Sequence, residues 1–322
     1  MMGYRPYLTG IIGRLFIVAW LTLMLNACGD SAPQAEHGQP QDARLSDQEL
    51  SARQAPAVSE EKVYRFGFDS RGSAQEDARQ YLPLLQYLER VTGYHFKLRF
   101  TRAEEDIVSN LGTGKVQFAA IGAVSFITAQ RRYNSIALAR GINAQGETTY
   151  RSYIVVRPDS PIKHIEDLRR QYFAFGSETS TQGYLIPRIV LQQHGLTLDD
   201  LAGYSYTGSH QSCAEAVMAR RAEACGMQDT LAERFAEQGD IRILDRSAYY
   251  PSSGIAASHS VPAEVIAKVK AALLAFDPTG RNAAGLYAWE RTEMPKGFAA
   301  APPEDYRQFE TWMDKFNPKE AS

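Results

Sequence analysis

The chain has 322 residues, enough for two ordinary domains, and 44% of them are hydrophobic, so it can build large cores. Its net charge is −2, from 35 basic and 37 acidic residues, and no basic run stands out. These values argue against nucleic acid as the main partner.

The N-terminal residues have the pattern of a bacterial export signal. Two arginines precede an apolar run over residues 15–25, which is shorter than the roughly 20 residues of a membrane span. The run leads into Leu25-Asn26-Ala27-Cys28, which resembles a lipoprotein signal whose cysteine is lipidated. We therefore predict a signal peptide over residues 1–27 and a lipid anchor on Cys28. An uncleaved anchor and simple secretion are the alternatives.

A polar segment and then a folded region follow the signal. Residues 28–61 are rich in Gln, Ala and Ser and lack apolar periodicity, which predicts a disordered tether. We expect strands at 63–68, 94–100, 116–121, 152–156, 171–175, 204–206, 224–227 and 241–244. We expect helices around 82–88, at 103–111, from about 125, at 165–168, after 180, at 212–221 and 263–275, and at the C-terminus. Strands that alternate with helices predict an α/β fold with mostly parallel sheets.

One stretch, Phe175 to Tyr184, has the composition of an anion receptor. A strand leads into a turn of Ser, Thr and Gly and then into a helix, whose first N–H groups have no partner within the helix. The hydroxyls of Ser180 and Thr181 are additional donors. An ordinary N-cap uses the same residues without any ligand. Pro187 predicts a local distortion at the start of this helix.

Several motifs occur in the order found in one protein family. They are Tyr150-Arg151-Ser152-Tyr153-Ile154-Val155-Val156, Ser180-Thr181-Gln182-Gly183-Tyr184-Leu185-Ile186-Pro187, Thr207-Gly208-Ser209-His210 and Gly114-Lys115-Val116-Gln117-Phe118-Ala119. Residues 63–309 resemble the phosphate/phosphite/phosphonate-binding family, the periplasmic receptors of ABC importers. The resemblance implies a type II periplasmic binding protein fold, with two α/β lobes joined by two crossings and a ligand in the cleft. We expect residues 62–151 and 250–322 to form lobe 1 and residues 152–249 to form lobe 2.

The resemblance also implies ligand-binding residues. Ser180, Thr181 and Gln182 match a Ser-Thr-Ser triplet that holds phosphonate oxygens, with Gln182 as a departure that still donates through its amide. His210 matches a Gly-x-His ligand contact, although an exposed loop histidine has the same pattern. Ser125 begins a helix in the first lobe, where a hydroxyl serves an anion or caps the helix.

Two further residues complete the predicted site. Tyr150 lies at the first crossing, where its phenol can reach the ligand or pack in the hinge. Asp229 lies close to where aminoalkylphosphonate binders of the family carry an amine-binding carboxylate, and it also suits a helix cap. A second family carboxylate is replaced near Ser253, which argues against an aminophosphonate ligand.

Two cysteines, Cys213 and Cys225, remain besides Cys28. In an oxidising compartment they can form a disulfide, and a helix followed by a strand permits that geometry. The sequence leaves the bridge and two buried free thiols open and slightly favours the thiols. A soft-oxyanion or metal site is a weak third alternative, because the two cysteines have no His or Cys cluster nearby, and we expect no cofactor.

These observations predict a binding protein. We expect a monomeric, lipid-anchored receptor in the periplasm that delivers a phosphorus oxyanion to an ABC permease. A protein of the same fold that signals to a sensor kinase is the alternative. An enzyme is disfavoured because the sequence has no nucleophile elbow, no zinc-ligand spacing and no phosphate-binding Gly-Lys-Ser/Thr loop.

Overall fold

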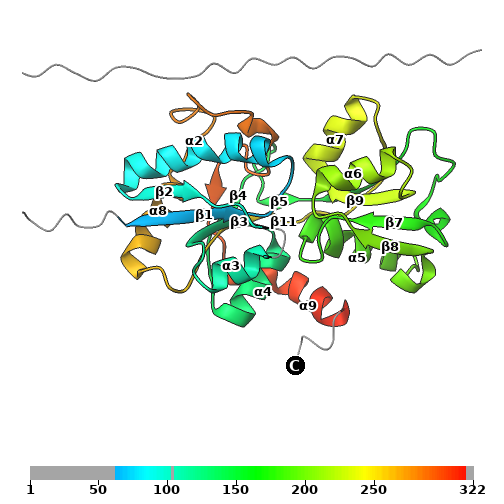
Figure 1. Cartoon of the computed structure of the whole chain (residues 1–322), viewed down its shortest axis with the longest axis horizontal. Helices are drawn as coiled ribbons and strands as arrows, with labels where there is room; N and C mark the ends of the chain where they lie inside the picture. The colour runs from blue at the N-terminus through cyan, green and yellow to red at the C-terminus, as the bar shows by residue number, and fades with distance from the viewer. Residues whose placement is uncertain (1–61, 103–104, 317–322) are drawn as a thin grey trace, which may run out of the picture. The chain divides into compact units, whose positions relative to one another are not determined.

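Residues 62–102 and 105–316, which a computed structural model describes, are built on two large β-sheets (Figure 1). The first sheet has the strand order β13-β4-β12-β3-β1-β2. Its strands are β1 (Val63–Phe68), β2 (His95–Leu98), β3 (Phe118–Ile121), β4 (Ile136–Gly141), β12 (Gly254–Ala257) and β13 (Phe298–Ala299). The second sheet has the order β10-β6-β9-β7-β8. Its strands are β6 (Ser152–Val156), β7 (Tyr172–Phe175), β8 (Gly203–Tyr206), β9 (Ala224–Gln228) and β10 (Arg242–Arg246).

Two short strands lie where the chain passes between these sheets. Strand β5 (Thr149–Tyr150) follows the first four strands, and β11 (Tyr250–Pro251) leads back from the second sheet to β12. They pair antiparallel, with Tyr250 opposite Tyr150. We call the first sheet with its helices the first lobe and the second sheet with its helices the second lobe. Both lobes belong to one compact unit of the chain.

Antiparallel pairs occur in both sheets, but most strands of each sheet run in one direction, as expected. Strand β1 is parallel to β2 and β3, and β7 is parallel to β8 and β9. Strand β12 is antiparallel to both β3 and β4, and β6 is antiparallel to both β9 and β10. Each of these two strands is the first one after a crossing. Each is reached directly from a crossing, without the helix that connects successive parallel strands within a lobe.

Helices cover both faces of the first sheet (Figure 1). Helices α2 and α8 pack together on one face, and α3, α4 and α9 lie on the other. Their bounds are α2 (Ala74–Thr92), α3 (Ile107–Gly112), α4 (Ala123–Tyr133), α8 (Ala263–Leu274) and α9 (Arg307–Phe316). The long α2 begins where the Ser73 hydroxyl accepts a hydrogen bond from Glu76 N, and it ends at Gly93, whose φ of 72° suits glycine.

The second sheet is covered in the same way. Helices α6 (His210–Met218) and α7 (Asp229–Glu237) pack on one face, and α5 (Ile186–Gln193) packs on the other. Alternate side chains of β6 divide between the two faces: Tyr153 and Val155 contact the first pair, and Ile154 and Val156 contact α5. Short helical turns complete the chain: η1 (Ile165–Leu168), η3 (Leu198–Asp200), η4 (Trp289–Arg291) and η5 (Pro303–Tyr306).

The distortion predicted from Pro187 is confirmed. A π-helical turn, η2 (Thr181–Leu185), precedes α5. Because Pro187 has no N–H, it leaves the carbonyl of Gly183 without a helical partner, and Gly176 N donates to that carbonyl at 2.9 Å. The proline therefore shapes the same turn that the sequence marks as an anion receptor.

The predicted signal peptide, Cys28 and the tether lie outside the described residues. Within residues 62–102 and 105–316, no helix is both long and apolar enough to cross a membrane.

Candidate ligand-binding site

The turn between β7 and α5 is closed by its own hydrogen bonds. Ser180 is the N-cap of η2, and its hydroxyl oxygen accepts from Gly183 N at 2.9 Å. A Cβ on Gly183 would come within 2.8 Å of that hydroxyl and 3.1 Å of the His210 ring. A glycine at this position therefore lets the turn lie close to His210. Ser180 is therefore a helix cap in this structure. Because its oxygen is the acceptor in this bond, the hydroxyl proton can still be donated to a ligand.

Thr181 joins the two lobes. Its hydroxyl oxygen accepts from Val124 N, in the first turn of α4, at 2.9 Å, and only 2% of the residue is exposed. A Cβ on Gly122 would lie 2.8 Å from this oxygen, so glycine permits the approach. The bond uses the oxygen as an acceptor, and the hydroxyl proton remains available to a ligand.

The start of α4 is held by a carboxylate from another part of the chain. Asp69, directly after β1, accepts from Gly122 N at 2.9 Å and from the Ser125 hydroxyl at 3.2 Å. The Ser125 hydroxyl also lies 3.3 Å from the carbonyl oxygen of Thr179, and Ser125 is fully buried. Ser125 thus supports Asp69 and lies beside the cavity without lining it.

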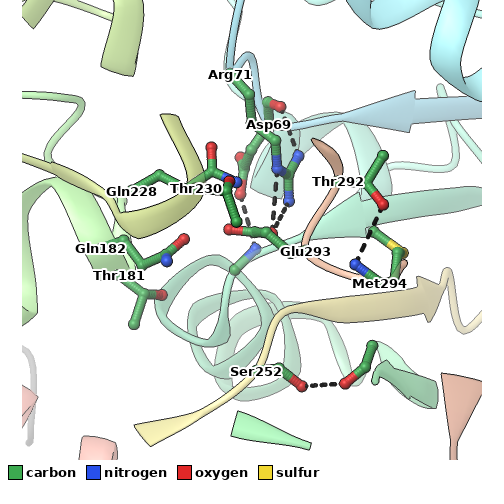
Figure 2. A network of polar contacts seen from close by, with 12 residues as sticks. Asp69, Arg71, Thr181, Gln182, Gln228, Thr230, Ser252, Thr292, Glu293 and Met294 are labelled. Carbon is green, nitrogen blue, oxygen red and sulfur yellow. Dashed lines mark hydrogen bonds and ion pairs between the residues drawn. The ribbon is translucent and has the colours of Figure 1, made fainter. Parts of the chain in front are cut away.

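An ion pair forms another part of the first-lobe wall (Figure 2). The Arg71 guanidinium donates to Glu293 at 2.8 and 3.2 Å, and it donates to the Asp69 carbonyl at 2.9 Å. The Glu293 side chain is 2% exposed and that of Arg71 12%. Burial alone would lower the pKa of Arg71, but Glu293, Tyr81 and Asp69 together outweigh burial, and the pKa is raised. Arg71 therefore stays protonated.

His210 contributes a neutral donor. It is the first residue of α6, whose N-cap is Ser209; the Ser209 hydroxyl accepts from Ser212 N at 3.0 Å. The helix therefore begins two residues before the predicted start at residue 212. His210 is 7% exposed, and burial lowers its pKa to about 4. Its Nδ1 accepts from Gln228 N at 3.2 Å, which places the proton on Nε2. It is a buried helix residue and not an exposed loop histidine.

The side-chain amide of Gln182 donates its hydrogen bonds to protein groups. Its amide nitrogen donates to the Arg151 carbonyl at 2.8 Å and lies 3.3 Å from the Asp229 carboxylate. Asp229 also accepts from Arg151 N and from Thr230 N in the first turn of α7. Burial raises the pKa of Asp229 to about 6. Asp229 is thus the first residue of α7, whose N-cap is Gln228, and its bond from Arg151 N ties it to the first crossing.

The Tyr150 hydroxyl is buried at the hinge. Burial raises the pKa of Tyr150, and the nearby Thr181 and Ser253 side chains offset only part of this rise. Among the described residues this hydroxyl makes no hydrogen bond, and Tyr150 is 3% exposed. A buried donor without a partner costs free energy, so this phenol is available to a bound group.

A cavity of about 50 Å³ lies between the two walls. Its lining consists mainly of small and polar residues: Asp69, Ser70, Arg71, Gly122, Gly176, Ser177, Ser180, Thr181, Gln182, Gly208, Ser209, His210, Ser253 and Glu293. Four of the seven predicted ligand residues line it, namely Ser180, Thr181, Gln182 and His210. Tyr150 and Asp229 line a separate hollow of about 110 Å³, which shares Glu293 with it. The volume suits a few water-sized groups, as in a small oxyanion.

A disulfide joins Cys213 of α6 to Cys225 of β9, with their Cα atoms 5.9 Å apart. The sequence allowed either a bridge or two free thiols and slightly favoured the thiols; that preference was wrong. The bond became possible because α6 packs directly on β9. It fixes the helix whose first residue is His210. No group of three or more metal-binding side chains occurs among residues 62–102 and 105–316.

Comparison with known proteins identifies the family. The model of the family described as "ABC transporter, phosphonate, periplasmic substrate-binding protein" matches residues 66–306. The chain belongs to this family. The phosphonates-binding periplasmic protein of Escherichia coli K12 is 33% identical over 144 residues, 43% of each chain. The probable ABC transporter phosphite binding protein PhnD1 of Prochlorococcus marinus MIT 9301 is 29% identical over 154 residues, 45% of this chain and 46% of the relative.

Solved structures agree on the fold of this phosphonate-binding family member. PhnD1 of Prochlorococcus marinus in complex with methylphosphonate has a TM-score of 0.71 at 19% identity, covering 80% of this chain and 98% of that one. A binding protein component of an ABC phosphonate transporter from Pseudomonas aeruginosa has a TM-score of 0.69 at 21% identity, covering 78% and 85%. The expected two-lobed type II periplasmic binding protein fold is confirmed. The sequence matches to the two curated relatives span less than half of each.

The sequence analysis did not predict the three charged residues of the cavity, namely Asp69, Arg71 and Glu293. Asp69 follows β1 at its carboxyl end, where parallel sheets place ligands, so the strand pattern offered a signal for it. Glu293 lies in a loop 222 positions from Arg71, and no local pattern marks it. Its role follows only from the pairing of the two residues in space.

Proposed function

We propose that this family member is the substrate-binding protein of an ABC importer and takes a phosphorus oxyanion into the cavity between its lobes. The observation that supports this most is the convergence of donors from both lobes on one small polar cavity. The Ser180 and Thr181 hydroxyls and the His210 Nε2–H all lie at its lining. Preorganised neutral donors suit an oxyanion of this size.

Within this proposal the ligand is a phosphonate, phosphite or phosphate. Ser180, Thr181 and His210 contact its oxygens, and the hydrogen bond from Val124 N to Thr181 links the two lobes. Ser125 acts through Asp69, whereas Tyr150, Gln182 and Asp229 shape the hinge side. Transport is preferred to delivery to a sensor kinase because the family's description names an ABC transporter. No catalytic step is proposed.

Isothermal titration calorimetry of the purified full chain tests the ligand class. The panel is methylphosphonate, phosphite, phosphate, sulfate and methanesulfonate. We expect one phosphorus anion to bind with one-to-one stoichiometry and the sulfur anions to bind more weakly. Phosphorus NMR of the recovered ligand should show it chemically unchanged. Absence of binding by all three phosphorus anions would remove the proposal.

We also propose that Cys28 carries the lipid that holds the protein at a bacterial membrane on the periplasmic side. The support is the Leu25-Asn26-Ala27-Cys28 sequence. Intact-mass analysis of membrane-extracted protein should show an acylated Cys28, and Cys28→Ser should release the protein from membranes. A mature chain that begins elsewhere and is found free in the periplasm contradicts this part alone.

A further inference from the structure

The cavity contains a carboxylate where an anion receptor should have only donors. Asp69 lines it and accepts from Gly122 N at 2.9 Å, at the start of α4. A helix start is the place where the fold would otherwise offer N–H groups to a ligand. Any oxyanion that reaches Ser180 and Thr181 therefore meets the Asp69 carboxylate on the opposite wall.

The other charges around Asp69 do not neutralise it. The Arg71 side chain lies close, but its guanidinium is engaged by Glu293 at 2.8 Å. The cavity lining thus contains one cation and two carboxylates, and the buried His210 is uncharged. Tyr81 also lies near Asp69 and supplies no positive charge. A fully ionised dianion would be repelled by this wall.

One arrangement satisfies both the donors and the carboxylate. A monobasic phosphorus oxyanion has ionised oxygens for the second-lobe donors and one P–OH group that can donate. A carboxylate has about four lone-pair sites, and Gly122 N and the Ser125 hydroxyl use only part of them. Burial raises the pKa of Asp69, against the lowering by Gly122 N–H and Arg71, so one proton is readily shared between Asp69 and a ligand oxygen.

We propose that Asp69 determines specificity by accepting a hydrogen bond from the P–OH group of a monobasic oxyanion, which excludes anions that carry no proton. This inference rests on the proposed function, because it names the protonation state that the same cavity selects. A sulfonate is a fully ionised monoanion of similar shape without a proton. An oxygen of the sulfonate would then face the Asp69 carboxylate with no hydrogen between the two oxygens.

The test compares methylphosphonate with methanesulfonate by calorimetry. At about pH 6, where much of the methylphosphonate is monobasic, we expect the full chain to prefer it by at least about tenfold. Its affinity should fall toward about pH 8.5 as the ligand loses its proton. Asp69→Asn keeps an acceptor for Gly122 N and gains an amide donor. This variant should bind methanesulfonate at least about tenfold more tightly than the unmodified chain and lose most of the pH dependence.

Asp77→Asn is the matched control. Asp77 is also a buried aspartate beside Arg71. It accepts from Arg71 N and Gly72 N, each at 3.3 Å, but it does not line the cavity. Its discrimination should equal that of the unmodified chain. An equal shift in both variants would overturn the inference, because the effect would then be a general loss of negative charge.

The remaining outcomes separate this inference from the proposed function. If the unmodified chain binds methylphosphonate but binds it more tightly as the pH rises, the inference is overturned, and this result needs no variant to fold. The same holds if Asp69→Asn folds and keeps the original preference. If the unmodified chain binds no phosphorus anion, the proposed function itself is wrong.

Discussion

The two walls of the cavity are built in different ways. The second-lobe wall comes mainly from one short stretch, Gly176 to Gln182, with His210 beside it. The first-lobe wall combines Asp69 and Arg71 with Glu293, which lies 222 positions from Arg71 in the sequence. The first kind of wall is made by a local turn and can be recognised from consecutive residues. The second exists only after the chain has folded.

The walls also differ in how their polar groups are used. In the second lobe, Ser180 and Thr181 use their oxygens as acceptors and keep their hydroxyl protons. In the first lobe, Asp69 already occupies the helix start, and Arg71 already has its partner Glu293. Loss of a second-lobe hydroxyl should therefore affect the ligand most, while changes in the first-lobe wall should alter which ligand is chosen.

The disulfide of the second lobe has the largest expected effect. It closes a loop with a sequence separation of 12, and such a loop stabilises by about 3 kcal/mol in the chain-entropy description. Cys213→Ala with Cys225→Ala should lower the free energy of unfolding by about that amount. Hydrogen exchange should increase in α6 far more than in α2, because residues 62–151 contain no cysteine.

Thiol labelling supplies the control for this prediction. Alkylation of unfolded but unreduced protein should leave Cys213 and Cys225 unlabelled, and prior reduction should make both reactive. Labelling of both cysteines without reduction would mean that the second lobe has no such bond.

Thr181→Val tests the second-lobe wall directly. The change keeps the shape of the side chain and removes the hydroxyl. A hydrogen bond to a charged group contributes about 1.5–3 kcal/mol, so the affinity for the best oxyanion should fall by about 10- to 100-fold. Loss of the bond from Val124 N should also reduce the stability of the ligand-free protein by about 1 kcal/mol.

Thr128→Val is the matched control for Thr181. The Thr128 hydroxyl donates to the Val124 carbonyl at 2.8 Å within α4, outside the cavity. Calorimetry should give it an affinity close to that of the unmodified chain. If Thr181→Val changes only the unfolding transition and leaves the affinity intact, Thr181 is a structural bridge and the ligand contacts lie elsewhere.

The sequence predicted more of the second lobe than of the first. The Ser-Thr-Gln turn, the distortion at Pro187 and the strands 152–156 and 224–227 follow from local composition, and the structure contains them. Strands β4, β12 and β13 were missed. Strand β4 includes Arg140, which forms an ion pair with Asp305, a residue distant in the sequence. Strand β12 is a short apolar run whose composition does not distinguish a strand from other buried structure. Tertiary pairing decides such strands.

Ser180→Ala should have a smaller effect, and on a different quantity. The cap of η2 is lost, which typically costs about 1 kcal/mol of stability in the ligand-free protein. Affinity should fall less than in Thr181→Val. Ser73→Ala removes a comparable cap at the start of α2 and is the control. Both variants should lower the melting temperature, but only Ser180→Ala should change the affinity. A larger affinity loss at Ser180 than at Thr181 would reverse the assigned roles.

The smallest effect concerns His210 and the pH. Burial lowers its pKa to about 4, from 6.5 for a free histidine. Between these values the unfolded chain binds a proton that the folded protein does not, so stability falls as the pH falls through this window. From pH 7 to pH 6 the loss should be about 0.7 kcal/mol. His210→Gln should lack this contribution in urea unfolding at both pH values, and histidine NMR should show His210 still neutral at about pH 6. A free-histidine titration of His210 would mean that the residue is open to water, and the second-lobe wall would then contain a charged donor below neutral pH.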